Sequence, residues 1–146
     1  MNEQPPRPER EKVGTVARII HGAIAGGLAL VFAVFLYLRS QAVIEFPAER
    51  ARGLRLAAYL VLGAAILAAQ LLRGRITQPR HGADLSDWWT GSLPKAVVIW
   101  AVAEAGGLTS IVLGWLIADT SLLALGVAVG LALLFVSRPS RLESSH

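Results

Sequence analysis

Hydrophobic residues in this chain fall into four long runs, and most of the charged residues lie between them. The runs cover approximately residues 19–38, 56–72, 96–118 and 120–137. A helix that rises 1.5 Å per residue needs about 20 residues to cross a hydrocarbon core of roughly 30 Å. Strands of a membrane barrel would instead alternate apolar and polar residues. The pattern therefore predicts an all-α membrane protein with four transmembrane helices.

The runs divide the chain into a membrane domain and two tails. Residues 1–18 are rich in proline and charge, so we expect a disordered cytosolic tail. Residues 19–137 then form a four-helix transmembrane domain, and residues 138–146 form a short second cytosolic tail. The connection at Asp119 is so short that we expect the third and fourth spans to form a tight antiparallel hairpin.

The positive charges predict how the spans are oriented. The chain carries 14 Lys and Arg residues and a formal net charge of +4. Ten of these residues lie in the tails and in the loop between the second and third spans, against four between the first and second. Cytoplasmic loops carry the excess of Lys and Arg. We expect a multi-pass protein of the cell inner (cytoplasmic) membrane with both termini cytoplasmic.

Three tryptophans mark the expected limits of the hydrocarbon. Trp88 and Trp89 lie just before Pro94, which suits the first turn of the third span, and Trp115 lies near the other end of that span. Tryptophan is enriched at membrane–water interfaces because its ring is apolar and its N–H is polar. We expect Trp88 and Trp89 at the inner interface and Trp115 at the outer one.

An internal repeat relates the first and third spans. Residues 23–28 read AIAGGL and residues 103–108 read AEAGGL, so five of six positions match at an offset of 80 residues. A duplication would give two tandem hairpins with the first and third spans facing each other, as in parallel-repeat membrane proteins. Small apolar residues also recur by chance in membrane helices, so both explanations stay open.

Glycines on these spans allow close helix packing. Small residues at helical spacing let two backbones approach, as in the GxxxG pair formed by Gly22 and Gly26. The candidate packing glycines are Gly22, Gly26, Gly27, Gly106, Gly107, Gly114, Gly126 and Gly130. Such motifs pack within one chain as well as between chains. Self-association and contact with other membrane subunits are therefore open alternatives.

Glu104 is the acidic residue that the pattern places deepest in a span. It stands about 12 Å inside the third span at 1.5 Å per residue. An acidic residue at such depth costs about 2.5 to 3.5 kcal/mol on insertion scales, so it should face protein or water. His21 and Gln70 are its candidate partners. Carriage of a proton or cation, contact with a ligand, and a structural carboxylate that holds helices together are the alternatives.

Part of the chain resembles known membrane proteins. The stretch WAVAEAGGL at residues 100–108, the tight turn, and the ending Ser137-Arg138-Pro139 resemble a group of small bacterial four-helix membrane proteins, whose third helix carries a similar Ala-x-x-Glu motif. This resemblance implies the four-helix fold. The chain is more weakly similar to the proteolipid subunits of rotary ATPases and to small multidrug transporters. Their carboxylates lie in the second helix of a hairpin and in the first of four helices, respectively.

The sequence contains no catalytic constellation. No nucleophile is paired with a base, no phosphate-binding loop occurs, and the spacing of His81, Asp84 and Asp87 matches no strong metal pattern. We therefore expect no catalytic residue, no metal and no cofactor. Because Lys and Arg flank apolar segments, the lipid bilayer is the expected partner and nucleic acid is not. The sequence favours a non-enzymatic accessory or interaction component of a membrane complex, with a proton- or cation-coupled transporter or channel built on Glu104 as the alternative.

Overall fold

The computed structural model describes residues 7–41, 46–79 and 84–144. Within these residues it has four helices that are long and apolar enough to cross a membrane, and it has no strand. The helices are α1 (Arg7–Gln41), α2 (Ala48–Arg73), α3 (Leu85–Leu116) and α4 (Thr120–Val136), followed by the short α5 (Pro139–Glu143). The prediction of an all-helical chain with four such helices is confirmed.

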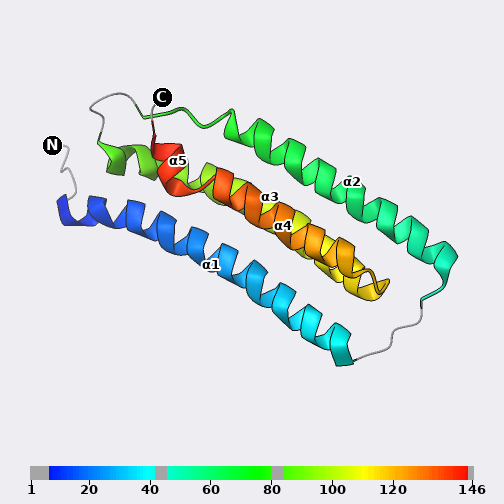
Figure 1. Ribbon diagram of the computed structural model, residues 1–146. Helices are drawn as coiled ribbons and strands as arrows, with labels where there is room; N and C mark the ends of the chain where they lie inside the picture. Colours follow the sequence, from blue (N-terminus) through cyan, green and yellow to red (C-terminus); the bar gives the residue numbers. More distant parts are fainter. Residues whose placement is uncertain (1–6, 42–45, 80–83, 145–146) are drawn as a thin grey trace.

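α3 is the centre of the helix arrangement. Figure 1 shows α3 and α4 together in the middle, with α1 along one side and α2 along the other. α3 packs against α4, α1 and α2, and its contact with α4 is the most extensive. Among the described residues, α1 and α2 share no packed interface. α1 and α3 run in the same direction (Figure 1), so these two helices face each other in parallel.

α1 begins earlier than the hydrophobic pattern predicts. It starts at Arg7, within the segment 1–18 that was expected to be a disordered tail. The cause is local, because Pro8 falls in the first turn, where its missing N–H needs no partner. The Arg, Glu and Lys residues that follow are good helix formers. Residues 7–18 are therefore helical and continuous with the rest of α1, whose candidate span begins at Val13 and ends at Gln41.

α3 also begins earlier than predicted. It starts at Leu85 rather than near Pro94, which lies inside the helix. Asp84 is the N-cap, and its side chain accepts a hydrogen bond from Ser86 N at 2.9 Å. An acidic cap satisfies a helix N–H and also interacts favourably with the positive end of the helix dipole. Both tryptophans that precede Pro94 thus belong to α3 itself.

Hydrogen bonds at Asp119 fix the turn between α3 and α4. Its backbone N–H donates to Gly114 O at 2.8 Å, which is the long hydrogen bond of a Schellman motif. Ala118 adopts the left-handed conformation that this motif needs, with a φ of 59°. The Asp119 carboxylate accepts from Leu122 N at 3.1 Å, which caps α4, and forms an ion pair with Arg55 of α2 at 2.8 Å. Asp119 thus stabilises the turn, caps α4 and links α2 to the α3–α4 hairpin.

Glycines bring α3, α4 and α1 together at one level. A Cβ added to Gly126 would lie 2.8 Å from Ser110 Cβ and 2.9 Å from Gly107 O. A Cβ on Gly130 would lie 2.6 Å from a methyl group of Leu28, and one on Gly107 would lie 3.2 Å from the same side chain. Leu28 is completely buried. The α4 backbone therefore lies directly against α3, and Leu28 of α1 fills the hole left by two glycines.

Two more glycines of α3 bring their backbone against other elements. A Cβ on Gly106 would lie 2.5 Å from Ala65 Cβ of α2, and one on Gly114 would lie 2.7 Å from Leu123 N of α4. Ala65 is buried, which places the closest approach of α2 at this level of α3. Glycine is thus what lets α3 accept a neighbouring helix on each of these sides.

The C-terminal segment folds back onto the bundle. Residues 138–146 were expected to be a short tail, but residues 139–143 form α5, which has Pro139 in its first turn. α5 packs against α1. Pro139 and Leu142 are buried. Because Leu142 belongs to the same core cluster as Leu28, α5 extends the hydrophobic core rather than leaving it.

A matched pair of glycine variants tests the role of the α3–α4 contact. Gly126→Ala should lower the free energy of unfolding by about 1 to 3 kcal/mol, because the backbone atoms of α3 that meet the new methyl group cannot turn aside. Gly63→Ala is the control, since nothing lies within 4 Å of a Cβ there. Thermal unfolding midpoints in detergent compare the two variants. Equal midpoints would contradict the proposed contact.

Candidate functional site

Glu104 lies in the seam between α3 and α1. Its side chain is half-buried, and its Oε1 lies 3.9 Å from the place of a Cβ on Gly27. Within the described part of the chain it forms no hydrogen bond and no ion pair. A glycine beside the carboxylate leaves room next to it that any side chain would reduce. The geometry therefore presents a carboxylate at the edge of a helix interface without a polar partner among the described residues.

His21, a predicted partner of Glu104, bonds to α4 instead. Its Nε2 lies 3.0 Å from Leu134 O, and because a carbonyl oxygen only accepts, Nε2 must carry the proton of this hydrogen bond. The imidazole also packs edge-on against Trp100, with ring centroids 5.2 Å apart. No hydrogen bond joins His21 to Glu104 among the described residues. The histidine thus donates a hydrogen bond to a carbonyl group at the C-terminal end of α4.

Side chains from three elements satisfy the C-terminal carbonyls of α4. The last four carbonyl groups of a helix have no partner within the helix. Ser137 Oγ donates to Leu133 O at 2.6 Å, and Trp100 Nε1 donates to Ser137 O at 2.8 Å. His21 provides the donor for the carbonyl of Leu134. Since Trp100 and Ser137 are buried, water does not replace these donors, and α1, α3 and α4 are joined by polar contacts there.

Gln70, the other predicted partner, lies apart from Glu104. Its side chain is exposed on α2, which packs on a different side of α3 from α1. Its backbone carbonyl accepts a hydrogen bond from Gly74 N at 3.1 Å and so helps to end α2. The structure therefore brings neither Gln70 nor His21 to the carboxylate.

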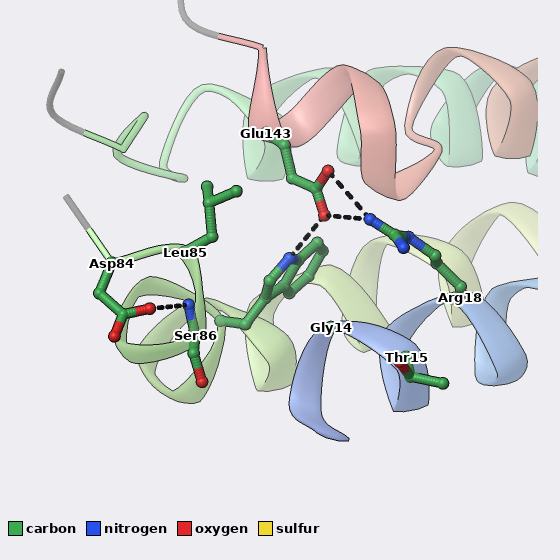
Figure 2. Close-up of a pocket in the computed structure, with 8 residues that line it drawn as sticks. Gly14, Thr15, Arg18, Asp84, Leu85, Ser86 and Glu143 are labelled. Carbon is green, nitrogen blue, oxygen red and sulfur yellow. Dashed lines mark hydrogen bonds and ion pairs between the residues drawn. The ribbon is translucent and has the colours of Figure 1, made fainter. Parts of the chain in front are cut away.

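A second polar cluster lies where α1 and α3 begin. Figure 2 shows Glu143 of α5 facing Arg18 of α1, with the first turn of α3 at Asp84 and Ser86 nearby. The Glu143 Oε1 atom accepts a hydrogen bond from Trp89 Nε1 at 2.8 Å and lies 3.4 Å from Arg18 Nη2. Trp89 is almost completely buried, whereas Arg18 is largely exposed. Glu143 thus joins α5 to both α3 and α1.

A cavity of about 210 Å³ opens beside this cluster. Gly14 and Thr15 of α1 form part of its wall, and Leu85 adds an apolar side (Figure 2). The two carboxylates on its wall, Asp84 and Glu143, are both engaged, the first as the cap of α3 and the second by Trp89 and Arg18. The polar groups of the cavity wall therefore serve to hold the helix ends together. We call the contacts of Glu143 with Trp89 and Arg18 the clasp at Glu143.

The tryptophans predicted for the interfaces lie toward the two ends of α3. Trp88 Nε1 donates to Thr77 O at 2.7 Å, and the Trp88 ring packs edge-on against Trp89 at 4.8 Å. Trp115 packs edge-on against Phe35 at 5.4 Å. Its Nε1 is buried and has no hydrogen-bond partner in the described part of the chain. Their depth in a bilayer stays a prediction.

The glycines of α1 differ from those of α3 and α4. Nothing lies within 4 Å of a Cβ added to Gly22 or Gly26, and both residues are exposed. A Cβ on Gly27 would meet only Glu104. The predicted packing glycines of α3 and α4, by contrast, are all buried against side chains or backbone of this chain. The GxxxG pair of α1 is therefore left uncovered.

Comparison with known proteins found no match, so the function is inferred from the geometry. No family model, curated protein or solved structure matches the chain. Three features then stand as candidates: the unpartnered carboxylate of Glu104, the clasp at Glu143 and the uncovered glycine pair of α1. Of the loop residues considered for a metal, His81 lies outside the described residues.

Sequence reasoning missed the side chains that join the helix ends. Trp100 stands at helical spacing from Ala96, Ala103 and Gly107, which are all buried with it. That spacing was a usable signal that the indole points into the core. Glu143 gave no such signal, because its place depends on α5 folding back against α1.

Removal of the Trp100 donor tests whether the α4 carbonyls depend on it. Trp100→Phe should lower the free energy of unfolding by about 1 to 3 kcal/mol, since it leaves the buried Ser137 carbonyl without a donor. Trp88→Phe is the matched control, because its hydrogen bond is exposed and water can replace the indole there. Unfolding in a denaturing-detergent titration measures both. An equal loss in the two variants would refute the role assigned to the buried bond.

Proposed function

We propose that this chain is a non-enzymatic polytopic membrane protein that works as an accessory or interaction component of a membrane complex. The observation that carries the proposal is the uncovered pair Gly22 and Gly26, which stands in contrast to the enclosed glycines of α3 and α4. Small residues four apart let a second helix approach closely in lipid, where van der Waals contact drives association. The outer face of α1 is therefore the proposed docking surface.

The exposure of α1 supports this proposal. Only 6% of the most apolar stretch of its candidate span is buried, against 44% in α3. α1 also contributes Leu28 to the core and the hydrogen bond from His21 to α4, so its inner face is fixed while its outer face stays uncovered. A helix that is held rigidly on one side presents its other side without an ordering cost on binding.

The second candidate function is a proton- or cation-coupled transporter or channel. Glu104 favours it, because a half-buried carboxylate inside a span, without a partner among the described residues, is costly in free energy. Ionisable residues retained at such positions commonly mark a proton or ion pathway. The arrangement around it supports the accessory function more strongly, since His21 is bound to α4 and Gln70 faces elsewhere. A relay needs a second group that receives the proton or ion.

We also propose two tandem hairpins, an internal duplication, and both termini in the cytoplasm of a cell whose inner membrane holds the protein. The repeat supports duplication because its two copies lie side by side in parallel helices. Leu28 of the first copy touches Gly107 of the second, and Gly27 lies beside Glu104. Because α1 and α2 share no packed interface among the described residues, α3 and α4 would have come to fill the space between them.

Reporter fusions test the orientation. A fluorescent protein that matures only in the cytoplasm, fused after His146, should be bright, because the two tails and the loop between the second and third spans, which carry ten of the 14 Lys and Arg residues, should face inward. The same reporter fused after Ser40 is the opposite-side control and should be dark. A dark C-terminal fusion with a bright Ser40 fusion would reverse the proposed topology.

Substitutions on the outer face of α1 test the proposed function. Gly22→Leu combined with Gly26→Leu should reduce co-purification of a partner subunit or second copy in mild detergent by about tenfold or more, since bulky side chains keep the helices apart. Gly63→Leu is the control, because nothing lies within 4 Å of a Cβ at Gly63 either. Proton or cation flux is also measured in liposomes that contain the purified protein. Flux that is lost in Glu104→Gln but normal in the glycine variants would contradict the accessory function and support the transporter.

A further inference from the structure

Two cavities follow the seam between α2 and α3. The first has a volume of about 330 Å³ and is lined by Leu72, Arg75, Lys95 and Val98. The second has a volume of about 320 Å³ and is lined almost entirely by small or apolar residues of the two helices, Ala68 among them. Neither cavity is part of the Glu104 seam or of the clasp at Glu143.

The two cavities lie one helical turn apart along the same seam and together make up the α2–α3 groove. On α2, Ala68 of the second cavity is one helical turn from Leu72 of the first. On α3, Val102 stands one turn from Val98 in the same way. The two helices run in opposite directions (Figure 1), so both walls descend together from the end of the bundle where α3 begins. The contact of Gly106 with α2 forms part of the floor.

The head of this groove carries positive charge that no described residue neutralises. Arg75 and Lys95 are both exposed, and neither forms an ion pair or side-chain hydrogen bond within the described residues. Lys95 also borders a neighbouring cavity with Asp84 and Asp87, but neither carboxylate pairs with it. The Asp84 side chain is bound to Ser86 N as the cap of α3. Two cations thus flank an apolar entrance.

The body of the groove suits a hydrocarbon chain. From Lys95 to Thr109 the groove follows α3 for about 21 Å at 1.5 Å per residue. That length exceeds half of a hydrocarbon core of roughly 30 Å, which is the depth of one leaflet. Ala64 and Ala105 on its rim are exposed, so the groove is open along its side to lipid. A free phosphate ion would use only the head of such a site.

We propose that the α2–α3 groove is a binding site for an anionic phospholipid. Arg75 and Lys95 contact the headgroup phosphate, and one acyl chain lies along the wall formed by Leu72, Ala68 and Val102. Basic pockets between membrane helices bind anionic headgroups, because Lys and Arg close to the membrane surface attract the negative charge of the lipid. The lipid fills a space that α2 and α3 leave open and so stabilises the contact of α2 with the bundle. This inference is independent of the docking surface on α1.

Native mass spectrometry of the full chain released from detergent tests the headgroup contact. The probes are phosphatidylglycerol and phosphatidylcholine with the same acyl chains. Binding of phosphatidylglycerol should be stronger, and Arg75→Gln combined with Lys95→Gln should weaken it by about tenfold or more. Arg50→Gln with Arg52→Gln is the matched control, since both are exposed arginines of α2 at its other end. Equal binding of the two lipids, or an equal effect of the two double variants, would overturn the proposal.

A groove-filling variant separates a lipid site from a site for free phosphate. Ala105→Leu leaves both basic side chains in place but occupies the path of the acyl chain, so phosphatidylglycerol binding should fall severalfold. Ala64→Leu, on the opposite wall, repeats the test if the first variant fails to fold. Excess inorganic phosphate should leave the bound lipid in place. Displacement of the lipid by phosphate, with normal binding in both folded leucine variants, would show an anion site in place of the lipid site.

Discussion

The close approach of the α3 and α4 backbones is the constraint on which the rest of the structure depends. Gly126 meets the backbone of α3 at Gly107 without an intervening side chain, and Leu28 inserts into the space that Gly107 and Gly130 leave. Three helices are thereby fixed at one level by van der Waals contact, which is the main attraction available between helices in lipid. α2 joins through a fourth glycine contact at Gly106 and through the Asp119–Arg55 ion pair at the turn.

Close packing of α4 has a consequence at its C-terminal end. A helix end held inside a bundle leaves carbonyl groups that water cannot reach, and an unsatisfied buried group costs about 1 to 3 kcal/mol. His21 and Trp100 supply the donors, and Glu143 then holds α5 over the same end through Trp89. The polar side chains of this region are therefore used for structure. That use leaves Glu104 as a carboxylate of the helix seams that no other side chain of the described residues engages.

The sequence predicted the features that bilayer physics dictates strongly. Uncharged runs about 20 residues long must form helices, because backbone groups in lipid have no other partner. The start of α4 was predicted at its observed residue because Asp119 is a strong cap. The extension of α1 was missed because its proline and charged residues indicated a disordered tail, and that of α3 because Pro94, which lies inside the helix, was placed in the first turn. α5 was missed because its five residues are too few to show a helical pattern in the sequence, and the helix depends on tertiary contacts.

The candidate site was harder to predict than the fold. The level of His21 on the first span suggested it as a partner for Glu104, but in the structure its Nε2 bonds to the carbonyl of Leu134 at the end of α4. The glycine motifs of α1 and α3 look alike in sequence, and only the packing distinguishes enclosed glycines from the uncovered pair. That difference separates a motif used inside the chain from one that this chain leaves uncovered.

A photo-crosslinking residue placed at Ala29 tests this account most directly. Ala29 is exposed and stands one turn from Gly26 on the outer face of α1. In native membranes the account predicts a discrete protein adduct from position 29 and none from the exposed Ala57 of α2, the matched control position. A product at neither position, or equal products at both, would contradict the claim that the uncovered glycine face of α1 is where this protein meets its partner.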